Sequence, residues 1–316
     1  MKTKKNTVYA IIGPSCSFKS KIGIDLACKF PFEIISADSR LIYKGMDIGT
    51  SKPTLKEREN IPHYMIDIFE PNFDYSVALY KKETESLIQK IFSKSKIPLF
   101  VGGTGLYLNS VLLGLTIPEV KPDSSFRRQL KKFTQEELYK NLRELDPKAT
   151  SIIHQNDNFR TVRALEVIYK TNKLFSELKT IKEQPFNVEW IGLSYMDRML
   201  HGDLIKKRAF AFCGNGLIDE VKSLIDKYGE LDLFKKTIGY SEVLEFLQNN
   251  SKLEDLIEKI TLNTKQLVKR QMTWFKANKK IKWVYLDDLN YNQVLERVLS
   301  LIEEESFANT SMLSVS

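Results

Sequence analysis

The N-terminal part of the chain defines one supersecondary unit. An apolar run at residues 8–12 leads into the segment GPSCSFKS at 13–20, and an amphipathic helical pattern follows it. A buried strand that turns through such a segment into a helix is typical of a phosphate loop, whose consensus is G-x-x-x-x-G-K-[ST]. Backbone N–H groups at the start of the helix then bind anionic oxygens. The alternative is an ordinary strand–helix turn without a ligand.

The phosphate-loop segment departs from its consensus at one position. Gly13, Lys19 and Ser20 match, but Phe18 stands where the second glycine belongs. We expect Lys19 to neutralise the outer phosphate and the Ser20 hydroxyl to ligate Mg²⁺. A side chain at position 18 is expected to crowd the phosphate or to force the loop open, because glycine lets the backbone approach most closely. The residues predicted to bind a diphosphate or nucleotide are Gly13, Pro14, Ser15, Cys16, Ser17, Phe18, Lys19 and Ser20.

Two further apolar runs, at residues 33–37 and 98–101, flank a helical pattern at 75–92. Strands that alternate with helices predict an α/β fold with a parallel sheet and crossover helices. In such a sheet, ligands bind beyond the carboxyl ends of the strands. Asp38 follows the second strand and Thr104 lies in a glycine-rich turn after the third. Both are therefore expected to meet the phosphate loop in one crevice.

Several roles stay open for these two residues at this point. Asp38 could be a magnesium ligand, a general base or a helix cap. Thr104 is flanked by glycines that would let its backbone and hydroxyl approach a ligand closely. The turn at 102–105 could equally be a tight turn that touches no ligand.

The sequence pattern changes twice in the rest of the chain. After residue 120 the pattern becomes that of basic amphipathic helices, and strand patterns return at 190–195 and 282–286. The predicted organisation is a first part of the α/β core at 1–120, a helical insertion at 121–185, a second part of the core with a helical C-terminal region at 186–306, and a frayed, disordered tail at 307–316.

Charge is distributed unevenly along the chain. The 48 basic and 40 acidic residues give a net charge of +8. Residues 121–182 carry 14 basic and 8 acidic residues, and residues 261–282 carry 7 basic residues and no acidic one. Such local positive charge favours a surface for a polyanion, whereas the alternative is solvated helix faces. Trp274 and Phe275 lie within the second segment, where we favour core packing over stacking on bases.

Composition excludes several classes of protein. With 42% hydrophobic and 28% charged residues, the chain has enough apolar material for a core, which excludes a wholly disordered chain. No apolar run is long enough to span a membrane. The cysteines Cys16, Cys28 and Cys213 are widely spaced and form neither a disulfide framework nor a zinc pattern, which favours a reducing cytoplasm.

Together the motifs resemble the tRNA dimethylallyltransferase (tRNA isopentenyltransferase) family of the bacterial type. The longest matching strings are ISADSRLIYKGMDIGTSKP at 35–53 and PLFVGGTGLYL at 98–108. Shorter matches follow in the family's order: PHYMIDI at 62–68, LDPKATSIIHQND at 145–157, RALEV at 163–167, GLIDEV at 216–221, TIGYSE at 237–242 and KRQMTWF at 269–275. The long strings are far more specific than a phosphate loop alone.

This resemblance implies a P-loop nucleoside-kinase-like sheet core with an inserted all-helical domain. It implies transfer of a dimethylallyl group from dimethylallyl diphosphate to N6 of adenosine 37 of tRNA, with release of diphosphate. It also implies Mg²⁺ as a cofactor, a nucleotide-binding (ATP-binding) type of loop, and the anticodon stem-loop of tRNA as partner, with the target adenine flipped out of its stack. We expect a cytoplasmic monomer that binds no membrane.

Residue by residue, the resemblance implies that Asp38 is the base for the adenine N6 amine. Lys19 and Thr104 are the other predicted catalytic residues. The positions implied to contact tRNA are Asp38, Ser39, Arg40, Leu41, Thr104, Arg127, Phe159, Arg160, Thr161, Val162 and Arg163. The reaction needs no histidine, so His63, His154 and His201 are expected to be structural, although His63 could line the channel for the lipid.

Two other functions must be separated from prenyl transfer. A P-loop kinase of a small metabolite would share the loop at 13–20, but it does not explain the string at 35–53 or the uneven charge. A catalytically impaired tRNA-binding homologue would explain Phe18, although the other matching residues of the site remain.

Overall fold

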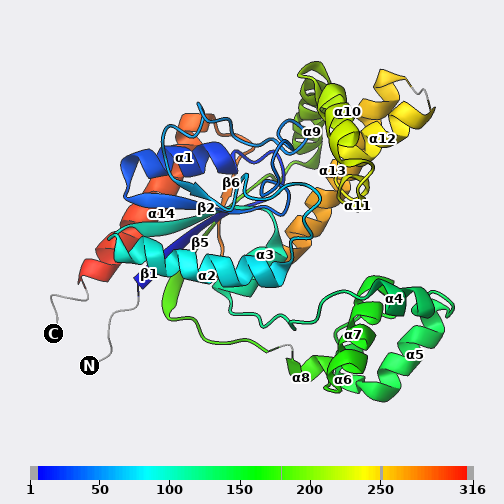
Figure 1. Cartoon of the computed structure of the whole chain (residues 1–316). Helices are drawn as coiled ribbons and strands as arrows, with labels where there is room; N and C mark the ends of the chain where they lie inside the picture. Colours follow the sequence, from blue (N-terminus) through cyan, green and yellow to red (C-terminus); the bar gives the residue numbers. More distant parts are fainter. Residues whose placement is uncertain (1–5, 179, 250–251, 312–316) are drawn as a thin grey trace. The chain divides into compact units, whose positions relative to one another are not determined.

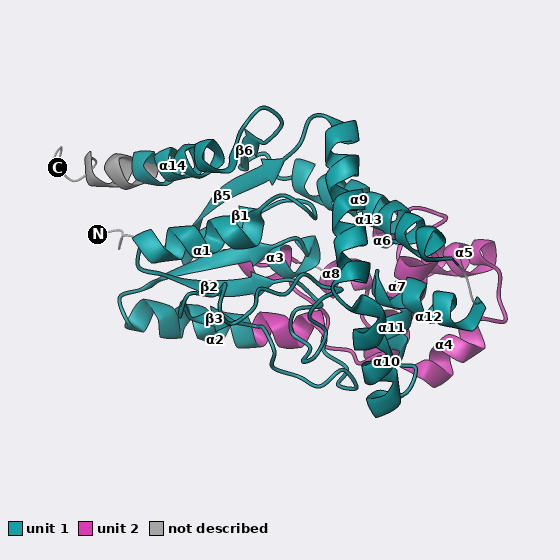
Figure 2. Cartoon of the chain, turned by 90° about the horizontal axis from the view of Figure 1, so that it is seen from above, with its two compact units in different colours: residues 1–75, 83–108, 185–316 teal, residues 76–82, 109–184 magenta. Residues whose placement is uncertain are grey.

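The computed structural model describes residues 6–178, 180–249 and 252–311, with side chains up to residue 304. The chain forms two compact units (Figure 2). The first unit holds residues 1–75, 83–108 and 185–316, and the second holds residues 76–82 and 109–184. The predicted helical insertion thus falls in the second unit, apart from residue 185.

A parallel sheet in the order β3-β2-β4-β1-β5-β6 forms the centre of the first unit (Figure 1). Its strands are β1 (Asn6–Ile12), β2 (Phe32–Ala37), β3 (His63–Tyr64), β4 (Ile97–Gly102), β5 (Phe186–Ser194) and β6 (Lys282–Tyr285). Every neighbouring pair is parallel, which confirms the predicted α/β fold. The sequence did not predict β3, because two residues directly after a proline carry no strand pattern.

The strand register fixes where the site forms. Ile12 at the end of β1 pairs with Gly102 at the end of β4, and Gly102 pairs in turn with Ala37 at the end of β2. The residues that follow these three strand ends are therefore neighbours at one edge of the sheet. They are Gly13, Gly103 and Asp38.

Amphipathic helices cover the sheet. The strands β2 and β4 are buried along nearly their whole length, as expected when helices pack on both faces of a parallel sheet. The helices α1 (Lys19–Lys29) and α14 (Tyr291–Ser311) share one core cluster with strand residues (Figure 1). In α14 the buried positions Val294, Val298 and Ile302 recur every four residues, which is the spacing of one helix face.

A helical region completes the first unit. It comprises α9 (Arg198–Gly214), α10 (Leu217–Tyr228), α11 (Asp232–Lys235), α12 (Tyr240–Asn249) and α13 (Leu253–Lys276). The helices α9 and α13 pack along each other. Phe275 of α13 is buried, which confirms the core packing favoured for this aromatic side chain.

The second unit is helical and has its own core. It contains α4 (Ser124–Leu130), α5 (Gln135–Leu145), α6 (Pro147–Thr150), α7 (Asn158–Thr171) and α8 (Phe175–Leu178). The helices α2 (Val77–Ser93) and α3 (Gly105–Leu112) each have residues in both units. The capping residues Asp123, Thr134, Asp146 and Asp157 accept backbone N–H groups at the starts of α4 to α7, which sets where these helices begin.

The C-terminal helix extends into the expected tail. The structure describes residues 307–311 as the last part of α14, and residues 312–316 lie outside the described residues. Among the residues described, no helix combines the length and the apolar character that a membrane span requires.

Candidate active site

The phosphate-loop segment joins β1 to α1 with an unusual backbone. A Cβ atom at Gly13 would overlap the carbonyl oxygen of Leu193, so only glycine fits there. Cys16 and Phe18 both have positive φ angles, 64° and 57°. Phe18 is the N-cap of α1, and its left-handed conformation is the one for which the consensus glycine is suited.

The Phe18 side chain contacts the C-terminal helix. Its ring meets that of Tyr291 edge-on, with 5.8 Å between centroids, and it is 44% exposed. Tyr291 is itself held by its hydroxyl, which donates to Asp25, and by Lys21, whose ammonium lies 4.0 Å from the ring centroid. The aromatic contact compensates for part of the cost of a left-handed phenylalanine.

Lys19 bends back over the loop. Its ammonium donates to the carbonyl oxygen of Pro14 and to Ser17 Oγ at 3.3 Å. Burial, together with the positive charge of Arg208 on α9, lowers the pKa of Lys19 to about 8. Arg208 therefore lies close enough to act electrostatically on the loop, and sequence reasoning had not singled it out.

Asp38 and Thr104 belong to adjoining turns. The carboxylate of Asp38 accepts the N–H of Arg40 at 2.8 Å, so it does cap the turn after β2. Thr104 Oγ1 accepts the N–H of Ser39 at 3.1 Å, and the Thr104 N–H donates to Ala37 O at 3.0 Å. The register thus brings Asp38, Thr104 and the phosphate loop to one edge of the sheet, as the sequence predicted.

The segment after Asp38 is fixed from outside the sheet. The Glu220 carboxylate of α10 accepts three consecutive N–H groups, those of Asp47, Ile48 and Gly49, at 3.0, 2.7 and 3.2 Å. The buried Lys52 donates to Tyr43 O at 2.6 Å. These bonds hold the backbone of the string at 35–53 in place. Among the described residues, the Arg40 guanidinium makes only long hydrogen bonds, at 3.4 Å to Ser39 O and Lys236 O, and Leu41 is half-buried.

A sequence model of the IPP transferase family matches residues 41–278. The chain belongs to this family. The tRNA dimethylallyltransferase of Dictyoglomus turgidum is 41% identical over 304 residues, covering 94% of this chain and 93% of the relative. That of Thermoanaerobacter sp. (strain X514) is 38% identical over 305 residues, covering 93% and 97%.

Solved structures of related transferases match nearly the whole chain. The tRNA isopentenylpyrophosphate transferase of Staphylococcus epidermidis matches with a TM-score of 0.69 at 33% identity, covering 95% of this chain and 100% of the other. A eukaryotic dimethylallyltransferase acting on tRNA matches with a TM-score of 0.82 at 28% identity, covering 96% and 80%.

In the second unit of this IPP transferase, two predicted tRNA-contacting arginines are held by an acid. The side chain of Glu166 is fully buried. Arg127 donates to both of its carboxylate oxygens, at 2.9 and 2.8 Å, and Arg163 donates to one of them at 2.5 Å. Burial raises the pKa of Glu166, but the hydrogen bonds from Arg127, the Asp123 N–H and Arg163 outweigh burial and leave this pKa below its usual value.

Only some of the side chains at 159–163 are exposed to solvent. Phe159 is 74% exposed, and the Arg160 side chain is 54% exposed and lies 3.3 Å from Asp157. Thr161 is buried and donates to Asp157 O, and Val162 packs against the core of the unit. A contact with RNA at this stretch would therefore start from Phe159 and Arg160.

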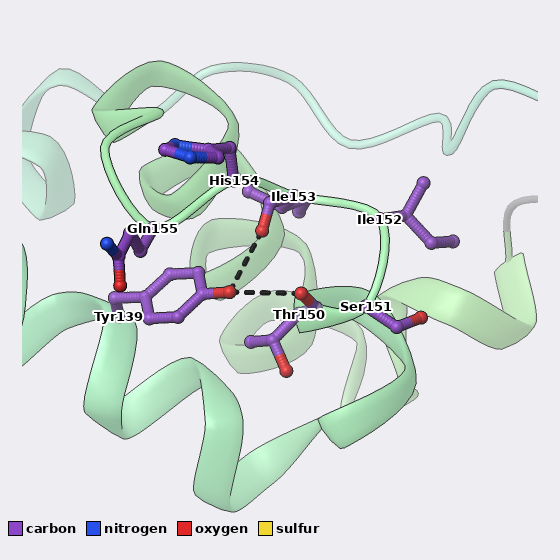
Figure 3. A pocket seen from close by; sticks show the side chains of 7 residues that line it. All are labelled: Tyr139, Thr150, Ser151, Ile152, Ile153, His154 and Gln155. Carbon is purple, nitrogen blue, oxygen red and sulfur yellow. Dashed lines mark hydrogen bonds between the residues drawn. The ribbon is translucent and has the colours of Figure 1, made fainter.

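A pocket of about 370 Å³ opens in the second unit just before this stretch (Figure 3). Tyr139 and residues 150–155 line it, and the Tyr139 hydroxyl donates to Thr150 O and Ile153 O, both at 3.0 Å. The lining includes His154 but no carboxylate or lysine, so it lacks an acid–base pair. None of the predicted site residues lines this pocket.

Proposed function

We propose that the chain transfers a dimethylallyl group from dimethylallyl diphosphate to N6 of adenosine 37 of tRNA and releases diphosphate. The observation that carries the proposal is the strand register, which brings the phosphate loop, Asp38 and Thr104 to one edge of the sheet. Membership of the IPP transferase family supports it, as do relatives named tRNA dimethylallyltransferase that span nearly the whole chain.

Asp38 supplies the base for the reaction. The exocyclic amine of adenine is a poor nucleophile, because its lone pair is delocalised into the ring. A carboxylate that accepts the N6 proton while the C–N bond forms removes this obstacle. The Arg40 N–H donates to Oδ1, and no hydrogen bond to Oδ2 is found among the described residues, which leaves an oxygen for the amine. Thr104 Oγ1 accepts from Ser39 and keeps its own proton to donate.

The phosphate loop stabilises the leaving group. Negative charge grows on the diphosphate as the allylic carbon departs, so positive charge placed there lowers the barrier. Lys19 and Arg208 supply this charge, and the N–H groups at the start of α1 add the helix N-terminus. The Phe18 ring packs on Tyr291, so this side chain is no argument against phosphate binding by the loop. We therefore favour an active enzyme over an impaired homologue.

Mg²⁺ fits the same loop. The Ser20 side chain is exposed at the first turn of α1, and the described residues contain no cluster of three or more His, Cys, Asp or Glu that could hold a metal alone. Mg²⁺ characteristically takes one or two protein oxygens and completes its shell with water and phosphate oxygens. Ser20 would hold the ion, which would screen the charge of the diphosphate.

The anticodon stem-loop of tRNA is the proposed macromolecular partner. In the first unit, α13 carries exposed basic side chains for which no salt bridge is found in the described part of the chain: Lys265, Lys269, Arg270 and Lys276. Cations on one helix suit phosphate contacts, which hold RNA without reading its sequence.

The thiols Cys16, Cys28 and Cys213 are all free, in keeping with the cytoplasm, and we propose that the enzyme is monomeric.

One experiment separates this function from that of a kinase. The protein is incubated with dimethylallyl diphosphate, Mg²⁺ and unmodified tRNA, and adenosine 37 is analysed by mass spectrometry. Addition of one dimethylallyl group is expected. Transfer of label from γ-labelled ATP to a small molecule, without prenyl transfer to tRNA, would instead establish a kinase.

Affinity for the prenyl diphosphate should depend on pH through Lys19. Its pKa of about 8 means that it loses its positive charge as the pH rises through that value. The dissociation constant of dimethylallyl thiodiphosphate should therefore rise above about pH 8, by up to about tenfold per pH unit. Calorimetric titration without Mg²⁺ measures this rise. In Lys19→Arg the guanidinium stays charged, so the profile should be flat; a flat profile in the wild type contradicts the assignment.

A further inference from the structure

The backbone of Ser15 in the phosphate loop is held on both sides by side chains from distant helices. Its N–H donates to Gln271 Oε1 of α13 at 3.0 Å. Its carbonyl oxygen accepts from His201 Nε2 of α9 at 2.8 Å. The His201 ring is buried and stacks on Tyr195 with 4.6 Å between centroids, which fixes its orientation. The conformation of the loop therefore depends on elements that follow the helical insertion.

The other end of the Gln271 amide reaches the turn that carries Thr104. Gln271 Nε2 donates to Gly103 O at 3.1 Å. A Cβ atom at Gly103 would overlap this amide, and one at Gly105 would lie 2.9 Å from the ring of Trp274. Gln271 and Trp274 are three residues apart and share a helix face. The close docking of α13 thus leaves little room for a side chain at either of these glycines.

A single amide therefore links the two halves of the proposed site. One end holds the loop for the leaving diphosphate, and the other end holds the turn whose Thr104 Oγ1 accepts the N–H of Ser39, next to Asp38. The contact needs an acceptor at one end and a donor at the other. An amide provides both, whereas a carboxylate provides only acceptors and an apolar side chain provides neither.

We propose that Gln271 is a positioning residue for prenyl transfer. It fixes the separation between the diphosphate loop and the turn of Thr104, and His201 supports the same loop from its other side. The inference rests on the proposed function, because it assigns those two turns to the leaving group and to the adenine. Displacements of about 1 Å in such a pair can cost about 10²-fold in rate.

The test compares Gln271→Met, which keeps the length of the side chain and removes both hydrogen bonds, with Gln89→Met. Gln89 is exposed on α2 and belongs neither to the site nor to the proposed tRNA-contacting side of α13. We expect Gln271→Met to lower kcat for prenyl transfer by about 10- to 100-fold. The KM for tRNA should stay within about twofold, because no tRNA contact is removed. Gln89→Met should behave as the wild type.

A double-mutant cycle separates positioning from a general loss of structure. If Gln271 acts through the turn of Thr104, the losses in kcat of Gln271→Met and Thr104→Val should not multiply in the double variant, since contacting residues couple. Losses that multiply, or a wild-type kcat in Gln271→Met, overturn the inference. If the proposed function itself is wrong, the result differs, because the wild type would then transfer no prenyl group to tRNA.

Discussion

Asp38→Asn should lower the single-turnover rate of dimethylallyl transfer by about 10²-fold or more. Asparagine keeps an oxygen that can accept the Arg40 N–H, which is the bond that the Asp38 carboxylate makes in the turn after β2. The substitution therefore preserves the local structure and removes the ability to accept the N6 proton. Rapid-quench measurement with saturating tRNA isolates the chemical step from product release.

Two further measurements make the Asp38 test specific. The affinity for tRNA should change little, because the amide can still hydrogen-bond the adenine. Asp203→Asn is a matched control, since Asp203 is exposed on α9 and lies outside the site. A single-turnover rate of Asp38→Asn equal to that of the wild type would leave Asp38 as a turn cap only, which is one of the roles that the sequence allowed.

The sheet and the meeting of its strand ends were predictable because their signals are local. The apolar runs of β1, β2 and β4 are each followed by a glycine or a turn residue, and parallel pairing then brings the residues after them together. Arg208 and His201 gave no such signal. They come from α9, after the insertion, and no spacing relates them to the loop. Gln271 lies in a string typical of the family, but the string does not reveal its bonds.

The surroundings of Phe18 depend on a contact that is not local in the sequence. From the sequence, the consensus glycine serves close approach of the backbone to a phosphate; the φ of 57° at Phe18 adds a backbone conformation that also favours glycine. The sequence could not show that the ring would contact Tyr291, which is far away in the chain. The residues at 159–163 show the same limit. Which of them are exposed depends on the core of the second unit, not on their order in the chain.

Glu166→Gln should destabilise the second unit. The buried carboxylate of Glu166 accepts from Arg127 and Arg163 and also from the Asp123 N–H at 2.7 Å. Loss of its charge leaves two guanidinium groups without a counterion. Breaking a fully buried pair costs about 3–5 kcal/mol, and we expect about 2–3 kcal/mol because the arginine side chains are 31% and 22% exposed. Denaturant unfolding, with hydrogen exchange over residues 109–184, measures the loss.

Glu144→Gln on α5 is the matched control for this measurement, since Glu144 is exposed and the same charge is removed. Its stability should stay within about 0.5 kcal/mol of the wild type. Equal stability of Glu166→Gln and Glu144→Gln would show that the two arginines do not depend on Glu166. They would then be available to RNA in the free protein without any cost to the fold.

A triple variant decides whether the two arginines also contact tRNA. Replacing Arg127, Arg163 and Glu166 together with methionine removes the whole ionic cluster, and apolar replacement of such clusters is often neutral for stability. We expect the triple variant to be more stable than Glu166→Gln and yet to bind tRNA more weakly. The slope of log K against log salt should become shallower by up to about two units, one for each lost phosphate contact. A stable triple variant with wild-type tRNA affinity and salt slope would assign both arginines to the fold alone, and it would leave Phe159 and Arg160 as the tRNA contacts of α7.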